Sequence, residues 1–216
     1  MTTHLRCFIL GLIACATAHG HQVPNMTIEA EFGAAGTFEM KVNVDPRVIL
    51  STQPDSLPPV EASWYLNQSS EQLKETLQKA TAYLEKNLKL TFGSVILPLR
   101  ECSWQAMDGA TNLALTAETT EAHLLATLKG SVPDAAREFV LGFGAEAKVS
   151  LILLLKNAGQ KEPKVQVIFP GENSRPFAIP ESPVKVVTPA FNRLWLLAGL
   201  IPLSALIYAW WRRTTR

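Results

Sequence analysis

The sequence predicts a mostly β, α+β domain, in which antiparallel strands pack as a sandwich with one covering helix, followed by a single C-terminal transmembrane helix. Short runs in which apolar and polar residues alternate predict strands with one buried and one exposed face. One stretch with apolar residues at a period of 3.6 predicts the helix. A run of 18 residues without a charge, near the C-terminus, predicts the membrane span.

The N-terminus has the parts of a secretory signal. Arg6 lies in a short opening segment without acids, the apolar run of residues 7–17 follows, and an Ala-Thr-Ala cleavage sequence ends at Ala18. The apolar run is too short for a good membrane span. We therefore expect residues 1–18 to be removed as a signal peptide, which makes His19 the mature N-terminus.

A second interpretation of the signal stays open. The sequence Leu-Ile-Ala-Cys that ends at Cys15 resembles a bacterial lipobox, which would direct lipidation of this cysteine. The stretch between Arg6 and Cys15 is short for such a signal, and a lipid would duplicate the C-terminal anchor. Cleavage after Ala18 is therefore the favoured prediction.

Residues 19–178 are predicted to form one extracytoplasmic β-rich domain that begins with a hairpin. Residues 26–32 and 37–44 are the two strands, and the second alternates strictly between apolar and polar side chains. The Gly-Ala-Ala-Gly sequence at residues 33–36 is a plausible hairpin connection. The prolines that follow predict an irregular stretch.

Residues 69–88 predict the covering helix. Ser69 and Gln72 have the spacing of a capping box, in which each side chain bonds the backbone N–H of the other residue. An apolar stripe at helical spacing consists of Leu73, Leu77, Ala80, Leu84 and Leu88. One apolar stripe on a polar helix is typical of a helix that covers a sheet.

The rest of the domain returns to strands. They are predicted at residues 88–92, 95–99, 111–116, 123–129, 138–143, 149–156 and 164–169. The nearly continuous apolar run at residues 149–156 predicts a central strand that is buried on both faces. Residues 164–169 are expected to pair beside it, across a polar turn. The pattern does not give the order of the strands in the sheets.

The C-terminal part predicts a stalk, a membrane span and a short tail. Residues 179–193 are proline-rich and favour an extended stalk. Residues 194–211 would form a helix of roughly 27 Å, close to the bilayer core of about 30 Å. Three arginines in residues 212–216 place the tail in the cytoplasm by the positive-inside rule. The protein is therefore expected in the cell membrane, single-pass, with its domain outside (in the periplasm, if bacterial).

The composition of the exported part excludes some functions. It holds 15 Lys and Arg against 19 Asp and Glu, a net charge near −4, without the basic patch that nucleic acid binding requires. Cys102 is the one cysteine outside the signal, and a single thiol predicts a buried small hydrophobe. A catalytic thiol would need a histidine such as His123, but no local motif links the two. We expect no enzymatic activity.

One metal site is predicted from the mature N-terminus. A free amine on His19, two backbone amides and the imidazole of His21 can supply four nitrogens in one plane. That set suits Cu(II) or Ni(II), although it exists only after cleavage at Ala18. The alternative is a disordered terminus with two solvated histidines.

Several features resemble the extracytoplasmic N-terminal domain of HupE/UreJ-type proteins. They are the histidines after the signal, the early alternating strand, and residues 167–177, which read Val-Ile-Phe-Pro-Gly-Glu-Asn-Ser-Arg-Pro-Phe. Those proteins resemble nickel or cobalt permeases and accessory proteins of hydrogenase and urease operons. They continue into a multi-span domain, whereas this chain has one predicted span. The resemblance therefore implies an envelope accessory domain rather than a transporter.

The sequence favours two functions, and a hydrolase without a recognised motif is a third alternative. The first is a non-enzymatic, single-span accessory domain that contacts a protein partner in the same membrane, because a tether raises the local concentration of the domain there. The second is an envelope accessory protein that binds copper or nickel through His19 and His21.

Overall fold

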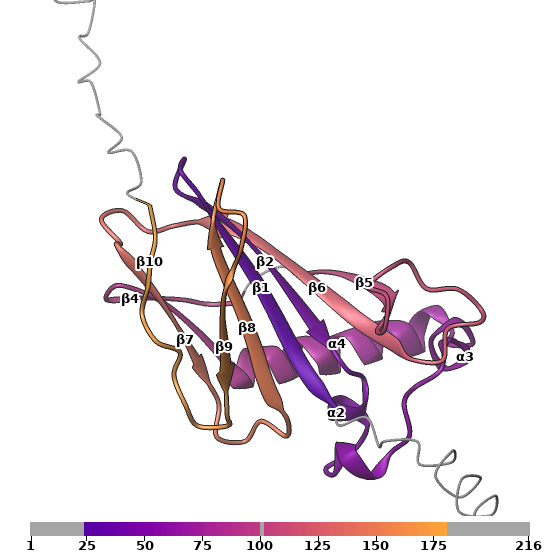
Figure 1. The fold of residues 1–216 in the computed structure, drawn as a ribbon. Coiled ribbons are helices and arrows are strands. Elements are labelled where there is room, and N and C mark those ends of the chain that lie inside the picture. The colour runs from indigo at the N-terminus through magenta and orange to yellow at the C-terminus, as the bar shows by residue number, and fades with distance from the viewer. Residues whose placement is uncertain (1–23, 100–101, 181–216) are drawn as a thin grey trace, which may run out of the picture. The chain divides into compact units, whose positions relative to one another are not determined.

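The computed structural model describes residues 24–99 and 102–180, which form two β-sheets and few helices (Figure 1). The strands are β1 (Asn25–Gly33), β2 (Thr37–Val44), β3 (Leu88–Phe92), β4 (Val95–Leu97), β5 (Ser103–Asp108), β6 (Ala122–Ser131), β7 (Glu138–Phe143), β8 (Ser150–Asn157), β9 (Lys164–Ile168) and β10 (Phe177–Ala178). The helices are α2 (Arg47–Leu50), α3 (Ala62–Leu66) and α4 (Ser70–Asn87), with a 3-10 turn, η1, at Pro54–Ser56. The mostly β class is confirmed.

The hairpin of β1 and β2 forms the centre of the larger sheet. Its strands pair antiparallel, with Phe32 opposite Phe38 at the turn end. The turn closes where the N–H of Gly36 donates to the carbonyl of Gly33 at 3.1 Å, and Gly36 has a φ of 70°, which suits glycine. Every second residue of both strands is buried, as the alternation predicts.

The large sheet has the order β5-β6-β2-β1-β8-β9. Its β8 runs parallel to β1, so the prediction of an antiparallel fold is wrong for this pair. The chain reaches β8 from β7, a strand of the other sheet, and this crossover sets the direction of β8. Alternation of side chains reports the faces of a strand but not its direction, so the sequence pattern could not show the parallel pair.

The burial of β8 also differs from the prediction. Leu151, Leu153 and Leu155 are fully buried, but Ile152 and Leu154, on the other face, are half-buried. Prediction of a strand buried on both faces was therefore wrong. The core lies on one side of the large sheet, and the long apolar run of β8 leaves apolar side chains on the opposite side.

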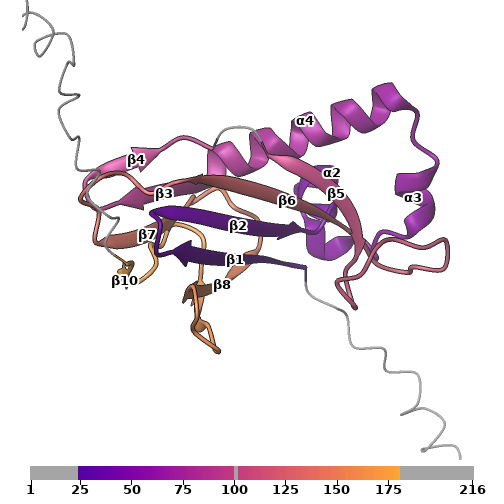
Figure 2. The same ribbon diagram turned by 90° about the horizontal axis from the view of Figure 1, so that it is seen from above.

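The small sheet and α4 together form the second layer (Figures 1 and 2). The small sheet has the order β10-β7-β3-β4 and shares one hydrophobic core with the large sheet. Helix α4 buries Ala80 and Leu84 in the same core, and the indole Nε1–H of Trp104 in β5 donates to Thr81 Oγ1 at 3.1 Å. The predicted covering helix is confirmed.

The capping box of α4 forms as predicted, and its removal has a defined cost. Ser69 Oγ accepts from the N–H of Gln72 at 3.3 Å, and Gln72 Oε1 accepts from the N–H of Ser69 at 2.8 Å. We expect Ser69→Ala to lower the free energy of unfolding by about 1 kcal/mol, measured by urea denaturation. Ser70→Ala is the matched control, since Ser70 follows the cap. Equal losses in both variants would contradict the assignment.

Some elements were missed or misplaced by the sequence pattern. Residues 111–116 are not a strand, because Asn112 has a φ of 58°, outside the β region, and Ala114 forms only an isolated bridge to Met107. The strand in this region is β5, which was not predicted. The short helices and β10 were not predicted either.

The predicted signal at residues 1–18, the span at 194–211 and the tail at 212–216 lie outside the described residues. The packing of the domain includes Ile179, the first residue of the predicted stalk, which is buried and donates its N–H to Arg137 at 3.0 Å. Among the described residues, no helix has both the length and the apolar character that a membrane crossing requires.

Candidate functional site

The outer face of the large sheet is the face turned away from α4 and the small sheet (Figures 1 and 2). The outward side chains of β1 and β2 are polar and exposed or half-exposed, as in a sheet with one wet face. They are Thr27, Glu29, Glu31, Thr37, Glu39, Lys41 and Asn43. Across the neighbouring strands this face divides into three zones of different chemistry.

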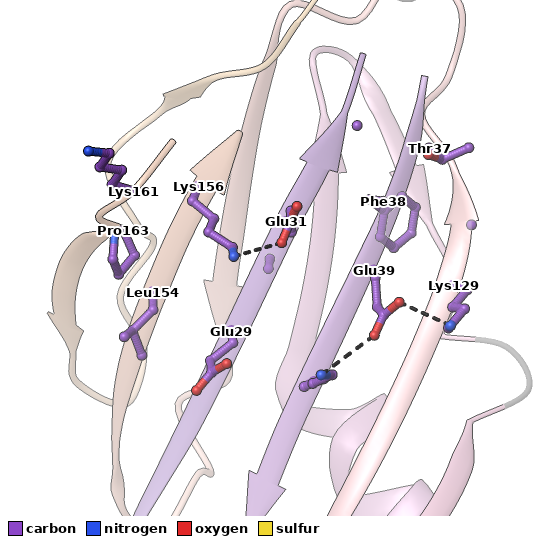
Figure 3. Close-up of a pocket in the computed structure, with 14 residues that line it drawn as sticks. Glu29, Glu31, Thr37, Phe38, Glu39, Lys129, Leu154, Lys156, Lys161 and Pro163 are labelled. Atoms are coloured by element: carbon purple, nitrogen blue, oxygen red, sulfur yellow. Dashed lines mark ion pairs between the residues drawn. The ribbon is translucent and has the colours of Figure 1, made fainter. Parts of the chain in front are cut away.

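The first zone is a charged strip across β8, β1, β2 and β6. Lys156 lies 2.7 Å from Glu31, and Glu39 lies 3.0 Å from Lys129 and 3.8 Å from Lys41 (Figure 3). The hydrogen bond from Lys129 lowers the pKa of Glu39, and the hydrogen bond to Glu31 raises the pKa of Lys156. Exposed pairs of this kind add little stability, so their main effect is to fix the pattern of charge.

The charged strip borders a hollow of about 710 Å³, which is lined on its β8 side by Leu154, Lys161 and Pro163 (Figure 3). Figure 3 shows these residues beyond Glu29 and Lys156, toward the edge of the sheet. On this side the lining is mixed, since the apolar Leu154 and Pro163 lie beside the charged Lys161.

The second zone is an apolar strip at this edge. It consists of Ile152 and Leu154 of β8, Val165 and Val167 of β9, and Phe169 just beyond β9. Ile152 pairs with Val167 and Leu154 with Val165, which places these four side chains on one face. Val165, Val167 and Phe169 are 61%, 57% and 57% exposed. A wet sheet face normally carries polar residues, so this strip departs from the pattern that β1 and β2 follow.

The third zone is a polar cluster at the other end of the face, where β2 ends and β6 begins. His123 Nδ1 lies 2.6 Å from Asn43 Oδ1, and His123 Nε2 lies 3.3 Å from Glu121 Oε1 and 4.0 Å from Asp45 Oδ2. Arg47 holds Asp45 through Nη2 at 2.6 Å and Nε at 2.8 Å. All four ionisable side chains are buried. This cluster was not predicted from the sequence, although Glu-x-His at the start of a strand places both side chains on one face and was a signal for it.

The residues singled out from the sequence are not brought together. His19 and His21 lie outside the described residues, so the N-terminal metal site stays a prediction. Cys102 lies on the core side of the large sheet and His123 on its outer face, so they do not form a pair. Burial, and next the charge of Glu85, raises the pKa of the Cys102 thiol, which disfavours the thiolate that a nucleophile needs.

The segment at residues 167–177 connects the two sheets. Its turn has Gly171 at a φ of 89°, with Glu172 Oε2 accepting from the N–H of Phe169 at 3.0 Å. The buried Ser174 then bonds Leu141 of β7 twice, through its Oγ at 2.9 Å and its N–H at 2.8 Å. Residues 167–177, which contribute to the HupE/UreJ resemblance, thus have a structural role in this domain.

Comparison of the chain with protein-family models, with curated proteins and with solved structures finds no match. The HupE/UreJ resemblance therefore stays a prediction, and a functional conclusion rests on the chemistry of the outer face.

Proposed function

We propose that this protein is a non-enzymatic accessory domain, anchored in the cell membrane by one C-terminal helix, whose apolar strip binds a protein partner in the same membrane. The exposed apolar strip of β8 and β9 carries the proposal. In the described residues Val165, Val167 and Phe169 are exposed and Ile152 and Leu154 half-buried, beside the polar outward side chains of β1 and β2. Contiguous apolar surface with a polar rim is typical of a protein interface.

The predicted tether supports a partner in the same membrane. The described domain ends at Pro180, and the predicted span begins at residue 194. The thirteen residues 181–193 reach at most about 47 Å when extended, so the domain would stay near the membrane surface. A tether of that length raises the effective concentration of the domain toward other proteins of that membrane.

The chemistry of the face favours a protein over the lipid surface. Anionic lipids attract clusters of lysine and arginine, but the lysines of the charged strip are paired with Glu31 and Glu39. The exported part is also acidic overall. The partner that fits is a protein segment with apolar side chains over Val165 and Val167 and polar groups toward the charged strip.

A charge placed in the apolar strip tests the proposal. We expect Val167→Glu to reduce co-extraction of the partner from membranes in mild detergent by tenfold or more, about 1.4 kcal/mol, because a carboxylate would be desolvated in the interface. Ile96→Glu is the matched control, since Ile96 of β4 is 55% exposed, close to the 57% of Val167, but lies in the small sheet.

The proposal fails if both variants keep the partner or if both lose it. It also fails if the extracted wild-type chain is alone or associated only with copies of itself. Thermal unfolding of both variants must match that of the wild type, so that a change in co-extraction reports the surface and not the fold.

A further inference from the structure

We propose that Asp45, Glu121 and His123 form a binding site for a first-row divalent metal ion, with Zn²⁺ as its representative. The proposal concerns the polar cluster and does not depend on the apolar strip or on the N-terminal histidines. One imidazole nitrogen and two carboxylate oxygens are a ligand set that Zn²⁺ accepts, with room for water at a further position.

The spacing of the ligand atoms fits one ion. One atom from each of the three residues can be chosen so that all lie within 4.8 Å of one another. His123 Nε2 lies 3.3 Å from Glu121 Oε1 and 4.0 Å from Asp45 Oδ2. Bonds of about 2.0–2.2 Å in a tetrahedron place neighbouring ligand atoms about 3.4 Å apart. The distance from His123 to Glu121 already matches this spacing. The distances from Asp45 to the other two ligand atoms require side-chain shifts of about an ångström.

The hydrogen bonding of the two ring nitrogens of His123 is an independent indication that Nε2 binds a ligand. Asn43 Oδ1 lies 2.6 Å from Nδ1, and Asn43 Nδ2 donates to Asn112 Oδ1 at 3.4 Å, which assigns the oxygen of Asn43 to the histidine. Nδ1 therefore carries the proton, and its hydrogen bond orients the ring as a typical second-shell contact does. Nε2 is buried and has no hydrogen-bond partner among the described residues, since this unprotonated nitrogen and the carboxylate of Glu121, 3.3 Å away, are both acceptors.

The space beside the three side chains and the contacts that hold the His123 ring also suit a metal site. Asp45, Glu121 and His123 line one cavity of about 310 Å³, which leaves space for a water ligand. Gly109 closes over the ring, because a Cβ at this position would lie 2.7 Å from His123 Nε2. The ring is thus held by Asn43 on one side and by the backbone of Gly109 on another.

The positive charge of Arg47 limits the affinity of the site for a cation. With a neutral imidazole, the two carboxylates and Arg47 leave the cluster at −1, so one divalent ion changes it to +1. Arg47 orients Asp45 but also opposes the ion, and we expect weaker binding than in a site without a guanidinium. The rival state is metal-free, with an imidazolium of His123 paired to Glu121 and the cluster neutral.

The test uses the full chain in detergent, stripped of metal, with His19→Ala and His21→Ala introduced so that the N-terminal prediction cannot contribute. We expect one equivalent of Co²⁺ to give visible ligand-field bands that Zn²⁺ abolishes, and Zn²⁺ to raise the melting temperature. Glu121→Gln, which keeps the shape of the side chain, should weaken Co²⁺ binding at least tenfold. Glu29→Gln, a change in the same cavity outside the ligand set, should leave binding unchanged.

Absence of stoichiometric Co²⁺ and Zn²⁺ binding in the folded protein would overturn the proposal in favour of the imidazolium state. Equal weakening of Co²⁺ binding by Glu121→Gln and Glu29→Gln would overturn it as well. It would show that the general negative charge of the cavity attracts the ion, without a defined set of ligands. His123→Gln is the second variant, and retained binding in this variant would exclude the imidazole as a ligand.

Discussion

Replacement of Phe32 by alanine is expected to lower the free energy of unfolding by about 3–5 kcal/mol. Phe32 is fully buried at the point where the large and small sheets meet, and its ring centroid lies 5.2 Å from that of Phe139, 5.6 Å from Phe177 and 6.2 Å from Phe92. The substitution removes the shared member of this aromatic cluster and leaves a cavity that β1 and β7, fixed by their ladders, cannot close. Urea denaturation followed by circular dichroism measures the loss.

Phe169→Ala is the matched control for Phe32→Ala. Its side chain is 57% exposed and belongs to the apolar strip. We expect a change of less than about 0.5 kcal/mol, since most of its surface is in water before and after the substitution. Similar losses for both phenylalanines would contradict the placement of the core between the two sheets.

Replacement of Arg47 is expected to cause the second large loss of stability. Arg47 and Asp45 are 1% and 2% exposed at their side chains. The guanidinium contacts Asp45 Oδ2 at 2.6 and 2.8 Å, the N–H of Arg47 donates to Asp45 Oδ1 at 2.9 Å, and Arg47 Nη1 donates to the carbonyl of Leu57 at 3.2 Å. Arg47→Met should lower the free energy of unfolding by about 3–5 kcal/mol, because Asp45 is left as a buried charge without its main partner.

A double-mutant cycle separates this penalty from lost packing. Asp45→Asn combined with Arg47→Met removes both charges, so we expect the double variant to be clearly more stable than Arg47→Met alone. Lys79→Met, at the exposed pair with Glu75, should change stability by less than about 0.5 kcal/mol. Additive losses in the buried cycle would show that the pair does not act as a unit.

Local sequence patterns correctly predicted the secondary-structure elements that depend on residues close together in the chain. The alternation of β2 gives its buried and exposed faces because neighbouring side chains of a strand point to opposite sides. Ser69 and Gln72 gave the start of α4, since the capping box lies within four consecutive residues. The β1–β2 hairpin follows from two such strands and a glycine-containing turn.

Features that depend on residues far apart in the chain could not be predicted in this way. The parallel pairing of β8 with β1 joins strands more than 100 residues apart. The polar cluster unites Asp45 with His123 only because β6 pairs with β2, and no alternation pattern encodes that register. Asn112 breaks an apparent strand through a positive φ, which asparagine tolerates but does not demand.

The wrong prediction of burial for β8 bears on the proposed interface. Its apolar run predicts burial on both faces, and within residues 24–99 and 102–180 a covering layer lies on only one. Disagreement between a local pattern and the fold is expected where a sequence serves a function beside stability. We propose that the partner protein covers Ile152 and Leu154, over which the described residues place no further layer.

Photo-crosslinking from position 167 tests the proposed interface most directly. The full chain, in its own membrane, would carry a photoreactive residue in place of Val167, and in a parallel sample in place of Ile96. We predict one major adduct with a different integral membrane protein from position 167, its loss when Val165→Glu is added, and no such adduct from position 96. No adduct from position 167, an adduct with lipid or with a second copy of the chain, or the same adducts from both positions would contradict the account.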